Sequence, residues 1–149
     1  MNDEYHRRAV VIGMVIFTLI ILILATLLKG MPSIYQNGIK VRIEMGELDW
    51  SLFFDEPYEK VIFIFTDQTW IGFHTYNEYQ INLHPPYFIE AIERECGKDV
   101  KDIATIIHNH PTPRRFTPGD NRVYNYFLDA GFRGAFMIYY PFSKRTIKK

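Results

Sequence analysis

Two histidines, His108 and His110, and an acid further along the chain, Asp120, have the types and spacing of a metal site. Residues 103–108 are apolar and mostly β-branched, which predicts a buried strand, and side chains two apart in a strand point to the same face. Residues 117–120 read Thr-Pro-Gly-Asp, a helix start with a capping hydroxyl, an early proline and an acid in the first turn. Two imidazoles and a carboxylate are a usual ligand set for catalytic zinc, which leaves its fourth position to water. The alternative is that the histidines only end a strand and the acid only caps a helix.

The histidine motif and the segments around it resemble a known family, the JAMM (MPN-plus) metalloproteases, and in particular its RadC-like branch. Residues 108–111 read His-Asn-His-Pro and precede Thr117 and Asp120, which stand where the family has Ser and Asp. The order of segments from Glu59 to Tyr140 also matches that of a JAB domain. The interval before Thr117 is one residue shorter than in most members, and threonine replaces the usual serine.

The resemblance implies a role for each residue of the motif. The implied Zn²⁺ ligands are His108, His110 and Asp120. Glu59 would be the general base that takes a proton from water, and the Thr117 hydroxyl would stabilise the tetrahedral oxyanion. Without the resemblance, Glu56 or Glu47 would be nearly as good a base, and Thr117 is explained equally well as a plain helix cap.

Other polar residues and the overall charge narrow the functional classes. Asn109 is expected on the strand face opposite the two histidines, and His84 fits a helix-entry turn better than a ligand position. The single cysteine, Cys96, excludes an intrachain disulfide and the paired cysteines of the zinc deaminases. The chain has 17 basic and 17 acidic residues, and this balance argues against general nucleic-acid binding.

Residues 9–28 form an uncharged apolar run that predicts one membrane-spanning helix after a short flank, residues 1–8. A helix of twenty residues is about 30 Å long, the thickness of the hydrocarbon core. A secretory signal would have an apolar core of about 7–15 residues and a small-x-small cleavage site. Basic residues are similarly frequent on both sides, so the sidedness of the membrane is not predicted. Residues 29–38, rich in turn formers, are expected to be a linker.

Residues 39–149 are expected to form one α/β domain, an MPN/JAB-like mixed sheet with flanking helices. Strands are expected at 39–43, 60–65, 70–76, 103–108 and 134–140, and helices at 48–54, 85–96 and 120–130. The short helix at 48–54 is expected to turn Leu48 and Leu52 towards the core.

The sequence therefore predicts a single-pass, membrane-anchored zinc metallopeptidase or isopeptidase that acts on a protein or peptide. Two alternatives stay open. One is a non-catalytic JAB/MPN-like scaffold for protein interaction at the membrane. The other is a RadC-like DNA-repair accessory, which lacks the expected basic surface. Oligomeric state is not predicted.

Overall fold

The computed structural model describes residues 16, 33–36, 39–47, 49–77, 81, 83–110 and 114–149. The chain divides into two compact units, Met1–Pro32 and Ser33–Lys149, and the features below belong to the second. The predicted membrane-spanning segment, 9–28, lies outside the described residues except for Ile16. Within the part of the chain that is described, no helix is both long and apolar enough to cross a membrane.

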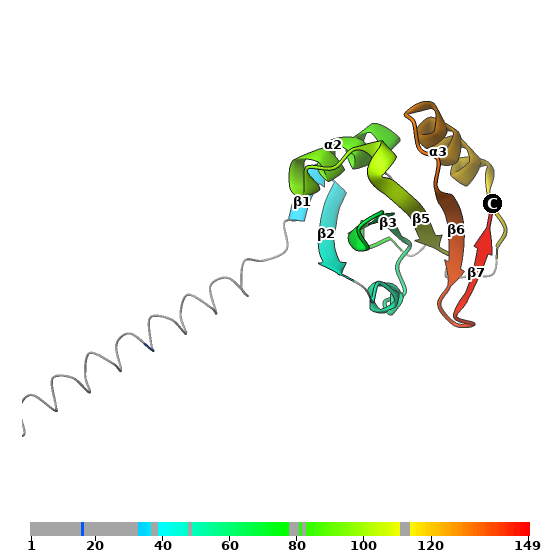
Figure 1. Ribbon diagram of the computed structural model, residues 1–149. Helices are drawn as coiled ribbons and strands as arrows, with labels where there is room; N and C mark the ends of the chain where they lie inside the picture. The colour runs from blue at the N-terminus through cyan, green and yellow to red at the C-terminus, as the bar shows by residue number, and fades with distance from the viewer. Residues whose placement is uncertain are drawn as a thin grey trace, which may run out of the picture. The chain divides into compact units, whose positions relative to one another are not determined.

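A seven-stranded mixed sheet is the centre of the unit Ser33–Lys149 (Figure 1). The strands are β1 (Ser33–Gln36), β2 (Ile39–Glu47), β3 (Lys60–Phe65), β4 (Thr69–His74), β5 (Ile103–Asn109), β6 (Ala135–Tyr140) and β7 (Arg145–Lys148). Their order across the sheet is β1-β2-β4-β3-β5-β6-β7. Only β5 and β6 run parallel among these neighbours; every other pair is antiparallel. Strands and helices in one sheet-centred unit confirm the expected α/β class.

Two helices and two short 3₁₀ turns complete the unit. They are α2 (Pro85–Cys96), α3 (Pro118–Asp129), η1 (Ser51–Phe54) and η2 (Val100–Asp102). The helix α2 ends where Gly97 adopts a left-handed conformation with φ 63°, which glycine adopts without steric cost. The helix α3 begins at Thr117, whose side chain accepts a hydrogen bond from the main-chain N–H of Asp120. Both helix boundaries follow the capping signals in the sequence.

The sheet has a different cover on each face. The helices α2 and α3 lie on the same side of it (Figure 1), and their buried side chains pack with Phe63, Phe73 and Ile106 of the sheet. Phe53 and Phe54 of η1 pack against the opposite face, together with residues such as Ile62 and Ile107. Because neighbouring residues of a strand point to opposite faces, Ile106 and Ile107 belong to different cores. The two faces are called the helix face and the η1 face below.

Three expectations differ from the structure. Residues 33–36, assigned to the linker, form β1 and pair with β2; this pairing uses the main chain and needs no apolar pattern. Leu52 is 66% exposed, because a 3₁₀ turn of four residues buries one side only and Phe53 and Phe54 occupy it. The strand β7 was not expected, and it pairs with β6 at the edge of the sheet. Leu48, the other residue expected to face the core, lies outside the described residues.

Candidate metal centre

The carboxyl end of β5 brings the two histidines to the helix face. His108 and His110 are each 6% exposed, and the main-chain N–H of His110 donates to the carbonyl of Tyr139, which extends the pairing with β6 by one residue. Their side chains point the same way because they are two residues apart in an extended segment. The sequence prediction of a shared direction is confirmed.

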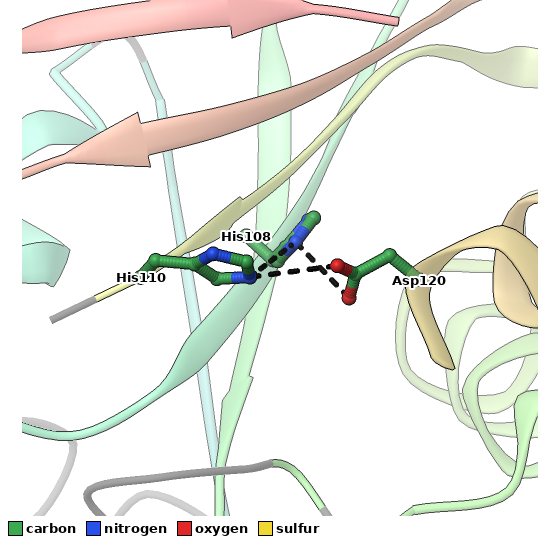
Figure 2. Close-up of side chains that lie close together, drawn as sticks. All are labelled: His108, His110 and Asp120. Atoms are coloured by element: carbon green, nitrogen blue, oxygen red, sulfur yellow. Dashed lines mark hydrogen bonds and ion pairs between the residues drawn. The ribbon is translucent and has the colours of Figure 1, made fainter. Parts of the chain in front are cut away.

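Asp120 reaches the histidines from the first turn of α3 (Figure 2). A capping box fixes its carboxylate: Oδ2 accepts hydrogen bonds from the main-chain N–H of Thr117 at 2.6 Å and from the Thr117 hydroxyl at 2.8 Å. The main-chain N–H of Asp120 in turn donates to the Thr117 hydroxyl at 3.2 Å. The bonds that start the helix therefore also aim the carboxylate at β5.

The distances between the three side chains fit a metal ion. The Nε2 atoms of His108 and His110 are 3.1 Å apart. Oδ1 of Asp120 lies 3.3 Å from Nε2 of His108, and Oδ2 lies 3.5 Å from Nε2 of His110. Tetrahedral Zn²⁺, with bonds of about 2.0–2.1 Å, separates its ligand atoms by about 3.3–3.4 Å. These three residues form a buried group that could bind a metal ion.

A hydrogen bond on the far side of the His110 ring supports this conclusion. Nδ1 of His110 lies 3.1 Å from the carbonyl oxygen of Arg114, which can only accept, so this nitrogen carries the hydrogen. His108 has a main-chain hydrogen bond with Met137. With its hydrogen on Nδ1, a neutral His110 ring turns the Nε2 lone pair towards Nε2 of His108 and the Asp120 carboxylate. Such an arrangement is stable when a cation lies between these atoms, either a metal ion or an added proton.

Burial and mutual attraction set the protonation of the three groups. Burial lowers the pKa of His108, although the hydrogen bond to Asp120 opposes this. Burial also acts against the charged form of His110, but the hydrogen bond and the negative charge of Asp120 outweigh it and raise the pKa of His110. Burial acts to raise the pKa of Asp120, but hydrogen bonds from both histidines hold that pKa well below its ordinary value. The carboxylate is therefore charged at neutral pH and ready to bind a cation.

Glu59 lies beside the candidate ligands because of the register between β3 and β5. Val61 is paired with His108, so continuing the antiparallel register places Glu59 opposite His110. Both side chains then belong to the helix face, and Glu59 lines the same cleft as the histidines. Burial raises the pKa of Glu59 to about 7, against the positive charge of His110. A carboxyl group with a pKa near neutrality suits proton transfer.

The other candidate bases lie elsewhere. The carboxylate of Glu56 forms an ion pair with Nζ of Lys60 at 2.7 Å, and this pair lowers the pKa of Glu56. The buried Lys60 ammonium also donates to the carbonyl of Phe53, on the η1 face. Neither Glu56 nor Glu47 is among the residues that line the cleft. Of the three acids left open by the sequence, Glu59 alone lies next to the histidines.

Asn109, between the two histidines, hydrogen-bonds to the main chain on both sides of Glu59. It is 1% exposed and lies between the histidines on the η1 face, as expected. Its Oδ1 accepts from the main-chain N–H of Lys60 at 2.6 Å, and its Nδ2 donates to the carbonyl of Tyr58 at 2.9 Å. The two bonds hold the main chain on both sides of Glu59. The sequence predicts a structural role for Asn109 but does not predict these contacts, because the partner segment is about fifty residues away in the chain.

The remaining predicted residues have clear positions. The Thr117 hydroxyl oxygen caps α3 by accepting from the main-chain N–H of Asp120. Its hydrogen, which stabilisation of an oxyanion would need, is donated to the Asp120 carboxylate. His84 is exposed and lines the cleft, but it is not part of the metal-binding group. His74 lies on the η1 face with its ring stacked on Tyr58, and burial lowers its pKa to about 4. Pro111, part of the motif, lies outside the described residues.

The group of His108, His110 and Asp120 opens into a cleft on the helix face. Its apolar lining includes Val61, Phe63, Leu83, Phe88, Ile106 and Val123, and its polar lining includes Glu59, Thr117 and the three candidate ligands. The cleft has a volume of about 1170 Å³. Clefts that combine an apolar lining with a few converging polar groups are the usual form of a binding site.

Comparisons of this chain with protein-family models, with curated proteins and with solved structures found no match. The family resemblance in the sequence motif therefore stays a prediction.

Proposed function

We propose that this protein is a zinc-dependent metallopeptidase or isopeptidase of the JAMM type, held at a membrane by residues 9–28. The observation that carries the proposal is the convergence of two ring nitrogens and a carboxylate, 3.1–3.5 Å apart, next to Glu59. A buried group of two imidazoles and a carboxylate is suited to holding a cation, because all three side chains can turn lone pairs to one point.

The proposed mechanism gives the metal ligands and Glu59 separate chemical roles. Zn²⁺ held by His108, His110 and Asp120 would supply a Lewis acid that acidifies water and polarises a carbonyl group. Glu59 accepts a proton from water and delivers it to the leaving nitrogen. Its pKa of about 7 allows it to hold the proton and to release it at neutral pH.

We assign Thr117 chiefly to orienting the Asp120 carboxylate. Stabilisation of an oxyanion is its second role. Its single hydroxyl hydrogen points to Asp120 Oδ2. Donation to a substrate oxygen would require that hydrogen to leave the carboxylate. This requirement is the one observation that favours the second candidate function, a metal-binding scaffold that recognises a protein without cleaving it.

Metal binding is tested by elemental analysis of the full chain, purified in a non-ionic detergent and reconstituted with zinc. We expect one zinc ion per chain, and a sharp loss in His108→Ala and in Asp120→Ala, because a site with two protein ligands holds zinc poorly. His84→Ala is the matched control, since this histidine lines the same cleft outside the ligand group. Failure of the unchanged protein to bind zinc would refute both the hydrolase and the metal-binding scaffold.

Catalysis is tested separately with a peptide and isopeptide library. Glu59→Gln should keep its zinc but lose hydrolysis by about 10²-fold or more, the usual contribution of a positioned general base. Glu56→Gln is the control and should retain activity, because Glu56 lies outside the cleft. Zinc binding without hydrolysis of any library member would favour the scaffold.

A further inference from the structure

One carbonyl oxygen, that of Arg114, takes part in two hydrogen bonds beside the candidate ligands. Nδ1 of His110 lies 3.1 Å from this oxygen, and the hydroxyl of Tyr140 donates to it at 2.5 Å. A carbonyl oxygen has two lone pairs, so it can accept both hydrogens at once. The ring of His110 and the hydroxyl of Tyr140 therefore meet at a single atom.

The main chain at Arg114 is not held by a helix or a strand. Residues 114–116 precede the cap of α3 and have no regular secondary structure. The side chain of Arg114 is exposed, whereas the ring of Phe116 packs against Phe136 with 5.7 Å between the ring centroids. The segment is thus held at Phe116, two residues further on. The direction of the Arg114 carbonyl therefore depends on the groups that donate hydrogen bonds to it.

Tyr140 reaches this carbonyl from the last position of β6. The main-chain N–H of His110 donates to the carbonyl of Tyr139, so the next residue, Tyr140, lies beside His110. Tyr139 belongs to the η1 face, where its ring packs with Trp50 and Phe54. Because neighbouring residues of a strand point to opposite faces, Tyr140 points to the helix face, as His110 does. The two adjacent tyrosines therefore have different neighbours.

The position of the ring hydrogen decides how His110 can bind a metal ion. When the Arg114 carbonyl holds the hydrogen on Nδ1, the Nε2 lone pair is free for a cation and the ring orientation is fixed. A carbonyl turned towards water would release the ring, and the tautomer with its hydrogen on Nε2 would then compete. The Tyr140 hydroxyl opposes this turn, because it forms the second bond to the same oxygen.

We propose that Tyr140 is a positioning residue of the candidate metal centre. Its hydroxyl holds the Arg114 carbonyl in the direction that binds Nδ1–H of His110, and this selects the ring tautomer that presents Nε2 to a metal ion. This role deepens the proposed function and rests on it for the metal ion. The choice of tautomer, however, is a property of the metal-free chain and is measurable there.

The first test is the zinc affinity of the full chain in a non-ionic detergent, measured by competition with a chromophoric chelator. Tyr140→Phe removes the hydroxyl and keeps the ring. We expect it to bind zinc about tenfold more weakly than the unchanged protein, since loss of an outer partner of a metal ligand usually costs roughly 10–100-fold in affinity. Tyr139→Phe is the matched control and should keep the affinity, because this tyrosine packs on the η1 face. Urea unfolding checks that each variant is folded under the conditions of the assay.

The second test reads the tautomer of His110 without any metal. Proton–nitrogen correlation NMR is recorded on the full chain with isotope-labelled histidine rings, at a pH where the His110 ring is neutral, and His110→Gln assigns the signals. We expect the hydrogen on Nδ1 in the unchanged protein and in Tyr139→Phe, and a mixture of tautomers in Tyr140→Phe. A tyrosine that only supported the fold would not shift this equilibrium.

The inference and the proposed function fail differently. An unchanged zinc affinity in Tyr140→Phe, an equal loss in Tyr139→Phe, or a His110 hydrogen on Nε2 in the unchanged metal-free chain overturns the inference. Failure of the unchanged protein to bind zinc overturns the proposed function instead. The tautomer then decides the inference alone: a shift in Tyr140→Phe supports it, and the same tautomer in both proteins overturns it.

Discussion

Replacing Glu59 with glutamine should stabilise the metal-free protein above neutral pH. Burial raises the pKa of this carboxyl group from 4.5 to about 7, which means that the folded chain disfavours the charged form. A shift of this size corresponds to about 3 kcal/mol, at about 1.4 kcal/mol per pH unit. Because Glu59 is only partly buried at the edge of the cleft, solvent screening reduces the effect, and we expect about 1–3 kcal/mol. Glutamine keeps the shape of the side chain and cannot ionise.

The sign of the pH dependence follows from proton binding. Between pH 4.5 and about 7 the folded chain binds more protons at Glu59 than the unfolded chain does. The stability of the unchanged protein, relative to Glu59→Gln, should therefore fall as the pH rises through this window and level off above it. Below this window both states hold the proton and the difference should vanish.

Urea unfolding in the presence of a chelator measures this difference. Both tryptophans, Trp50 and Trp70, belong to the unit Ser33–Lys149, so fluorescence of the full chain reports that unit alone. Glu90→Gln, an exposed carboxyl group on α2, serves as the control. A Glu59→Gln variant that is no more stable than the unchanged protein at pH 8–9, or a difference that does not change with pH, would refute the reasoning.

Three further predictions use the same unfolding assay. Thr117→Ala should lose about 1 kcal/mol with its cap while Thr117→Ser loses little, and equal losses would contradict the capping role. Asn109→Ala should destabilise the fold by about 2 kcal/mol or more, because it leaves main-chain groups of residues 58 and 60 without hydrogen-bond partners. Amide hydrogen exchange at Lys60 should become faster in this variant, and an unchanged exchange rate would contradict the contact. Gly134→Ala should lower the free energy of unfolding by more than about 3 kcal/mol, because a Cβ there would lie 2.1 Å from the carbonyl oxygen of Ala104. Gly119→Ala is the control: the nearest atom to its Cβ would be 3.4 Å away, so this change should be neutral or stabilising.

Local signals in the sequence predicted the parts of the site that depend on local structure. The β-branched run before His108 predicted β5, and the Thr-Pro-Gly-Asp start predicted the capped helix that carries Asp120. Alternation along the strand predicted that both histidines share a face. These features were confirmed because a strand direction and a helix cap depend on residues within one turn or one pleat.

Long-range pairing explains what the sequence could not decide. The choice between Glu59 and Glu56 needed the register of β3 against β5, which no local pattern contains. The strand β7 has four residues with one half-buried side chain, too few to show alternation. The strand β1 was missed for another reason: Asn37-Gly38, the strongest two-residue hairpin signal, stands between it and β2 and was read as linker. A helical period does not apply to the single 3₁₀ turn Ser51–Phe54, and this explains why Leu52 faces solvent.

The capping box at Thr117 has a consequence for how metal binding and folding would depend on each other. Thr117 fixes the Asp120 carboxylate through bonds that belong to α3, and the carbonyl of Arg114 fixes the ring of His110, so the donors are arranged before a metal arrives. Metal binding would then order little of the chain, and almost all of the coordination free energy would appear as affinity. A zinc finger folds only with its metal, whereas this unit would keep its fold when the metal leaves. The supply of metal in its compartment, and not its folding, would then set the fraction of loaded molecules.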